Sequence, residues 1–280
     1  MIDKNNEINK FTKKIWLSLE KQPYPTTSSK IRTIDYNSFK NIFLDLKKIE
    51  EIINCLFKGE IFIIKKAFDL EFIEKLKFAF NDFTEKNEST FYKLKEGCPN
   101  FHRIIDEKAS SSYSIKAIKH SAYFFPWNED EYKMFEEINE RWRFVKLLGG
   151  RKFDEFEKNT PKDGVIDRLQ ILNYPAGGEL ELHSDPFHNQ RMFISIYMSK
   201  RGKDYKEGGF YAMDENNQEI DIESFIDEGD LGIGYATIRH GVKKITDVEG
   251  SNAKRWFLGL YSNDSDEIKN RKTTMAIKNN

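Results

Sequence analysis

A histidine and an aspartate two positions apart, in the run ELHSD, are the residues of this chain best suited to chemistry. His183 and Asp185 lie in a short β-type stretch, where residues i and i+2 project from the same face of a strand. Both side chains can therefore reach one point. His240 follows in another β-type stretch, IRHGV. Two imidazoles and one carboxylate form a suitable ligand set for a divalent metal ion.

These three ligands would occupy one face of the ion and leave its other positions open. Non-heme iron(II) oxygenases use this arrangement because dioxygen and the substrate-side ligands need those positions. An H-x-D pair on its own is more often a hydrogen-bonded structural feature of a strand. The interpretation therefore depends on the surrounding sequence.

The elements that would position these residues are short β-type runs, which follow one another from about Val165 onward. Pro, Gly, Asn and Asp separate them, a pattern typical of an antiparallel sandwich or barrel. The runs are DRLQILNY, ELELHSD, RMFISIYMS, GGFYAMD, GDLGIGY, IRHGVKKI and KRWFLGLYS. Earlier in the chain, apolar periodicity predicts helices over 7–20, 36–57, 71–87 and 129–148, with a strand near 59–68.

We therefore predict an α+β fold: a double-stranded β-helix, or jelly roll, with N-terminal and flanking helices. Residues 1–57 are expected to form a helical N-terminal extension and residues 58–263 the β-helix domain. Residues 264–280 are expected to form a polar, mobile C-terminal tail.

Charge and composition narrow the class of protein. The 280 residues include 45 basic and 46 acidic side chains, a balance that argues against a dedicated nucleic-acid binder. No run approaches the ~18 apolar residues of a membrane helix, and charges interrupt the N-terminal stretch too often for a signal peptide. Cys55 and Cys98 are too few for a disulfide framework. We expect a soluble cytoplasmic protein without a membrane or nucleic-acid partner; its oligomeric state is unknown.

Several segments, taken in order, resemble the prolyl-hydroxylase and phytanoyl-CoA-hydroxylase type of iron(II)- and 2-oxoglutarate-dependent oxygenase. They span about 168–263 and read NYPAGGELELHSDP, FISIYMS, EGGFYAMD, EGDLGIGYATIRHGVKKI and KRWFLGLYSN. A weaker match is GEIFIIKKAFDLEFIEKLKFAF, which resembles the entry strand and helix. Several motifs in the same order are more specific than any one of them.

The resemblance implies that His183, Asp185 and His240 bind Fe(II). It also implies that Arg255 pairs with the far carboxylate of 2-oxoglutarate, which the planar fork of a guanidinium can bind through two parallel hydrogen bonds. Lys254 is the competing cation, but strand alternation places it on the opposite face.

The same resemblance assigns Tyr174 and Tyr197 to the surroundings of the co-substrate, with Asn173 as a weaker candidate. The alternative for each tyrosine is a buried aromatic ring with its hydroxyl hydrogen-bonded. One departure stands out: many relatives carry a small hydroxyl residue two positions after the arginine, where this chain has Phe257.

The activity implied is that of a dioxygenase that hydroxylates, or otherwise oxidises, a C–H bond of a small-molecule substrate with O2. Succinate and CO2 would be the co-products. Because Asp185 is retained, halogenation is disfavoured. Three alternatives stay open: a peptide or protein side-chain hydroxylase, a cupin-like metalloenzyme that does not use 2-oxoglutarate, and a non-catalytic binding module.

Other histidines are weaker candidates. His188 could contact substrate or lie exposed in a loop. His102, Arg103 and His120 belong to an aromatic-rich segment that could cover the mouth of the site. Core packing beneath the sandwich is the simpler interpretation of that segment.

Overall fold

The computed structural model describes residues 2–247, 252–271 and 275–276. The first half of the chain forms α1 (Ile2–Leu19), β1 (Lys30–Asp35), α2 (Tyr36–Ile42), α3 (Leu46–Phe57), β2 (Glu60–Lys65), α4 (Leu70–Lys86), β3 (Phe101–Ile105), α5 (Glu107–Ser110), β4 (Ala117–Phe124) and α6 (Phe135–Leu148). The second half forms η1 (Pro161–Asp163), β5 (Val165–Pro175), β6 (Glu179–Ser184), β7 (Met192–Tyr197), β8 (Gly209–Met213), β9 (Glu219–Asp221), η2 (Ile222–Phe225), β10 (Leu231–Tyr235), β11 (His240–Lys243), β12 (Lys254–Asp264) and β13 (Met275–Ala276).

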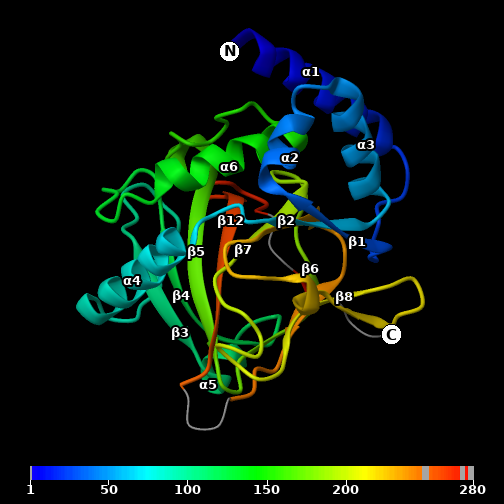
Figure 1. The fold of residues 1–280 in the computed structure, drawn as a ribbon. Helices are drawn as coiled ribbons and strands as arrows, with labels where there is room; N and C mark the ends of the chain where they lie inside the picture. Colours follow the sequence, from blue (N-terminus) through cyan, green and yellow to red (C-terminus); the bar gives the residue numbers. More distant parts are fainter. Residues whose placement is uncertain (1, 248–251, 272–274, 277–280) are drawn as a thin grey trace.

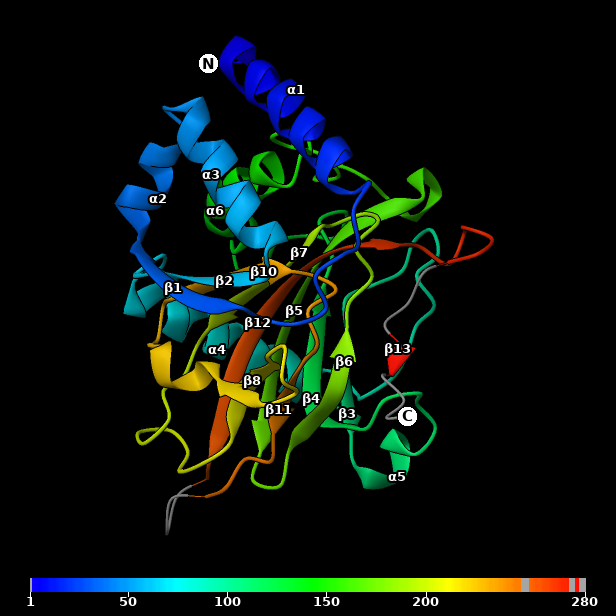
Figure 2. The same cartoon turned by 90° about the vertical axis from the view of Figure 1, so that its right-hand side faces the viewer.

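The strands pair in the order β1-β2-β10-β7-β12-β5-β4-β6-β11-β8-β9, with β3 beside β4 and β13 beside β6. β4 belongs to both halves of this curled sheet, because residues 117–118 pair with β6 and residues 120–124 pair with β5. Figures 1 and 2 show the sheet curving below helices α1, α2, α3 and α6. The predicted jelly roll with N-terminal and flanking helices is confirmed, and each of the seven predicted β-type runs contains a strand.

β5 and β12 pair in an unbroken antiparallel register, from Lys254 opposite Pro175 to Asp264 opposite Val165. Alternation gives the pair two different faces. The inner face points between the two halves of the sheet, and its cavity-lining residues are Leu172, Tyr174, Arg255, Phe257 and Tyr261. The outer face contributes Leu169, Ile171, Trp256, Leu258 and Leu260 to the main hydrophobic core.

Helix α4 covers part of this outer face. Asp69 caps its N-terminus by accepting a hydrogen bond from the backbone N–H of Phe72. Phe80 then packs edge-on against Trp256 of β12, with ring centroids 5.1 Å apart. Burial of such large aromatic rings is a major source of packing energy.

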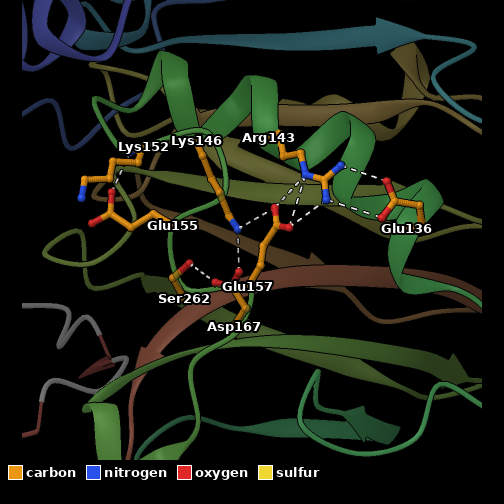
Figure 3. A network of polar contacts seen from close by, with 8 residues as sticks. All are labelled: Glu136, Arg143, Lys146, Lys152, Glu155, Glu157, Asp167 and Ser262. Atoms are coloured by element: carbon orange, nitrogen blue, oxygen red, sulfur yellow. Dashed lines mark hydrogen bonds and ion pairs between the residues drawn. The ribbon is translucent and has the colours of Figure 1, made fainter. Parts of the chain in front are cut away.

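Helix α6 is attached to the sheet by a buried polar network (Figure 3). Lys146 Nζ lies 2.6 Å from Oδ2 of Asp167 on β5, and Ser262 of β12 donates to Oδ1 of the same carboxylate at 2.7 Å. Glu157 connects Lys146 to Arg143. Burial raises the pKa of Asp167 to about 6, although the Lys146 ammonium opposes the shift.

The N-terminal segment differs from the prediction in two places. The helix expected over 36–57 is interrupted, because Asp45 caps a new helix by accepting from the backbone N–H of Lys47 at 2.9 Å. Residues 30–35, for which no strand was predicted, form β1 parallel to β2. All six residues of β1 are exposed or half-buried, so no apolar alternation reveals the strand.

The N-terminal helices pack on the same core as the sheet. Trp16 of α1 stacks on Tyr235 of β10 with centroids 5.6 Å apart, and its indole N–H donates to the carbonyl of Leu148 at 2.7 Å. In the described part of the chain, no helix has both the length and the apolar character needed to cross a bilayer. The predicted tail over 264–280 lies partly outside the described residues; within them, Met275 and Ala276 pair with β6.

We expect Lys146→Met to lower the free energy of unfolding by about 3–5 kcal/mol, because it leaves the buried Asp167 carboxylate without its cation. Lys152→Met is the matched control, since Lys152 is exposed near the same helix; this variant should unfold like the unmodified protein. Urea denaturation of both variants provides the measurement. Equal midpoints for the two variants would contradict a structural role for the network.

Candidate active site

The three predicted metal ligands converge between the two halves of the sheet. His183 of β6 and His240 of β11 are direct cross-strand partners, and Asp185 follows β6. Asp185 Oδ1 lies 3.8 Å from His183 Nε2, and its Oδ2 lies 3.8 Å from His240 Nε2. All three ligand atoms lie within 4.8 Å of one another, so this group can hold one metal ion.

Both imidazoles are oriented by their own backbone. His183 Nδ1 lies 2.8 Å from the carbonyl of Glu181, and His240 Nδ1 lies 2.8 Å from the carbonyl of Ile238. Since a carbonyl can only accept, Nδ1 carries the proton and Nε2 is left with a free lone pair. Burial, with His240 beside it, lowers the pKa of His183 to about 4. His183 is therefore neutral at neutral pH, as a metal ligand must be.

Arg255 is buried in the same cavity and already has one carboxylate partner. Glu223 of η2 accepts from Arg255 Nε at 3.0 and 3.1 Å and from Nη2 at 2.8 Å. Glu223 is itself held by the backbone N–H of Phe210 and the hydroxyl of Tyr205. Burial alone would lower the pKa of Arg255, but Glu223 raises it above its ordinary value. Within the described structure, Arg255 Nη1 is buried and has no hydrogen-bond partner.

The two candidate tyrosines lie in different places. Tyr174 is the cross-strand partner of Arg255 and lines the cavity with it; the Arg255 Cζ atom lies 5.8 Å from the Tyr174 ring centroid. Tyr197 does not line that cavity, and its hydroxyl lies against the backbone of Gly232, where any side chain would collide with it. The Tyr197 hydroxyl has no partner among the described residues.

Two cavities share His183 and Asp185 as lining residues. The inner cavity extends from the His-Asp-His group to Arg255, and Phe257 forms part of its wall. The outer cavity has a volume of about 430 Å³ and is lined by His183 and Asp185 of the same group. The residues common to both cavities are Lys119, Leu180, His183, Asp185 and Tyr261. A metal ion held there would face both spaces.

The aromatic-rich middle segment is divided between the two faces of the sheet. His102 and His120 point outward, with His102 Nδ1 2.9 Å from His120 Nε2 and the Phe80 ring 4.7 Å from the His120 ring. Burial lowers the pKa of His120 to about 4. Core packing is therefore the correct interpretation for both histidines. Arg103, in contrast, lines the outer cavity. His188 is exposed in its loop, as expected.

Several residues of the site were not predicted, namely Lys119, Arg168, Glu223 and Tyr261. The alternation of side chains along a strand could have identified two of them, Arg168 and Tyr261. Arg168 lies an even number of positions from Tyr174 in one strand, and Tyr261 lies an even number from Arg255 in the other, so each pair shares the inner face. Glu223 gave no such signal, because it lies in a short 3-10 turn.

No protein-family model and no curated protein matches the chain. Solved structures do match it. The thymine hydroxylase of Neurospora crassa, in complex with α-ketoglutarate and 5-formyluracil, has 13% identity and a TM-score of 0.51, covering 83% of this chain and 84% of that one. A C-terminally truncated apo form of the same protein has 14% identity and a TM-score of 0.50, covering 82% and 93%.

A prolyl-4-hydroxylase of Pseudomonas putida also matches, with 10% identity and a TM-score of 0.48 over 76% of this chain and 97% of that one. The chain thus has the double-stranded β-helix fold of the 2-oxoglutarate- and iron(II)-dependent oxygenases.

Replacing one ligand should remove the metal site without unfolding the protein. We expect His183→Ala or Asp185→Ala to weaken Fe(II) binding by at least about tenfold, because two ligands cannot hold the ion as three do. His188→Ala is the matched control, since His188 is an exposed histidine in the following loop. Anaerobic equilibrium dialysis measures the affinity. Unchanged affinity in both ligand variants would rule out this assignment.

Proposed function

We propose that this protein is an Fe(II)- and 2-oxoglutarate-dependent dioxygenase that oxidises a C–H bond of a small-molecule substrate. The observation that carries the proposal is the unpartnered Nη1 of Arg255, buried in the cavity that the His-Asp-His group also lines. A buried guanidinium donor without a partner is costly unless a ligand completes its hydrogen bonds.

The residues of the site suit both Fe(II) and 2-oxoglutarate. His183, Asp185 and His240 would hold Fe(II), and Arg255 would bind the far carboxylate of 2-oxoglutarate through Nη1. Once bound, iron and 2-oxoglutarate would supply the oxidising chemistry, with succinate and CO2 as co-products. The chain itself would position the reactants and exclude water. A cupin-like enzyme that does not use 2-oxoglutarate would have no comparable use for Arg255.

Tyr174 would form the wall beside the co-substrate. Burial raises the pKa of its hydroxyl, so the group stays protonated and can donate to a carboxylate oxygen. We propose a lesser role for Tyr197: its ring would support Phe257, since their centroids lie 6.4 Å apart. Phe257 would replace the hydroxyl contact that many relatives use with apolar packing.

The outer cavity supports a small-molecule substrate. Its volume of about 430 Å³ lies within the ordinary range of small-ligand sites, and it adjoins the predicted metal ligands His183 and Asp185. A peptide side chain entering the same space is the alternative.

An anaerobic titration tests the proposal as a whole. Adding Fe(II) and then 2-oxoglutarate to metal-free protein should produce a visible charge-transfer band, because the keto acid would chelate the iron. The band should be absent from His183→Ala. A protein that binds zinc tightly and gives no band would instead be a metalloenzyme of another class.

Arg255→Gln should raise the 2-oxoglutarate concentration needed for half of this band by at least about tenfold, since a charge-assisted hydrogen bond is lost. Fe(II) affinity should stay unchanged because Arg255 is not a ligand. The matched control is Lys254→Gln, as Lys254 does not line the cavity. If Lys254→Gln shifts the titration and Arg255→Gln does not, the co-substrate role belongs to Lys254.

A further inference from the structure

The outer cavity is unusually rich in positive charge. Arg103, Lys119, Arg168 and Arg271 all line it, and Asp185 is its one acidic residue within the described structure. Asp185 is also the predicted metal ligand, so its charge would be directed to the ion. Arg271 is paired with Asp266. Among the described residues, Arg103, Lys119 and Arg168 line this cavity without an ion-pair partner.

Arg168 is held by neighbouring side chains. Its guanidinium lies close to two rings, with Cζ 5.3 Å from the Tyr123 centroid and 4.8 Å from that of Tyr261. Nη2 donates to Oε1 of Gln170 at 3.2 Å. Its Nε is buried and has no hydrogen-bond partner among the described residues. These two aromatic contacts restrict the guanidinium, while its unpartnered Nε remains a donor for a ligand.

Lys119 lines both the outer cavity, with Arg168, and the inner cavity, with the His-Asp-His group. Neither Lys119 nor Arg168 has a carboxylate oxygen within 4.0 Å in the part of the chain that the structure describes. A desolvated cation needs a counter-charge to offset its lost hydration. Of the inner and outer cavities, Arg168 lines only the outer one, so a ligand that it binds there lies outside the co-substrate space.

From this arrangement we infer that the substrate is a small organic anion whose carboxylate or phosphate is bound by Arg168 and Lys119. The fork of Arg168 matches either group through paired hydrogen bonds. Tyr123 and Tyr261 would flank the organic part of the ligand. The inference rests on the proposed function only in calling this ligand the substrate; the anion site itself stands on the cavity.

Binding to metal-free protein tests the anion site without any oxidation. We would titrate benzoate against benzamide, and phenyl phosphate against phenol, following protein amide shifts by NMR. Each anion should bind at least about tenfold more tightly than its neutral counterpart. The pair with the larger ratio of anion affinity to neutral-ligand affinity identifies carboxylate or phosphate as the preferred group. Equal binding within both pairs would overturn the inference.

Variants locate the bound anion. Arg168→Gln should weaken anion binding at least about tenfold, whereas Arg255→Gln, in the inner cavity, should leave it nearly unchanged. Arg168→Lys should restore part of the affinity, because the charge is kept while the fork is lost. Loss in Arg255→Gln alone would assign the anion to the inner cavity and refute the inference.

The oxygenase proposal and the anion-site proposal can be refuted independently of each other. The charge-transfer band of Arg168→Gln should match that of the unmodified protein, which also shows that the variant is folded. A normal band with no preference for anions would overturn the anion site and leave the oxygenase proposal standing. Anion binding without any charge-transfer band would overturn the oxygenase proposal and leave the anion site standing.

Discussion

The pairing of β5 with β12 is the constraint on which the rest of the structure depends. One unbroken register sets Arg255 beside Tyr174 at one end and Tyr261 beside Arg168 toward the other. The inner face therefore holds two separate arginines, each next to a tyrosine, and it shares its cavities with the predicted metal ligands His183, Asp185 and His240. The outer face of the same two strands binds α4 and α6. A shift of this register by one residue would exchange the two faces and destroy both the cavity lining and the packing of the helices.

The buried charges on the two faces differ in how completely they are satisfied. On the outer face, Lys146 and Asp167 satisfy each other, together with Glu157 and Ser262. On the inner face, Arg168 and Arg255 each retain a buried nitrogen without a partner in the described structure. The complete network on the outer face holds helix α6 to the sheet, whereas the two unpartnered nitrogens on the inner face are the donors that the proposed ligands would bind.

Much of this arrangement could be predicted from the sequence. Short β-type runs broken by Gly and Pro predicted the strands. Alternation predicted that His183 and Asp185 share a face and that Lys254 and Arg255 do not, while the family resemblance assigned Arg255 to the co-substrate. The strand β1 was missed because its polar residues resemble a loop until β2 lies beside them. Glu223 was missed because only the folded chain brings a turn beside Arg255. Such contacts between distant segments leave no periodic signal.

The Glu223 contact has a consequence for how the inner cavity would receive an anion. Arg255 is ordered before any ligand arrives, so the entropy cost of immobilising its long side chain falls on folding rather than on binding. The arriving carboxylate would share the guanidinium with Glu223 instead of neutralising it. Affinity there would then depend on the segment between β8 and β10, because that segment carries Glu223, which accepts a hydrogen bond from the backbone N–H of Phe210 in β8.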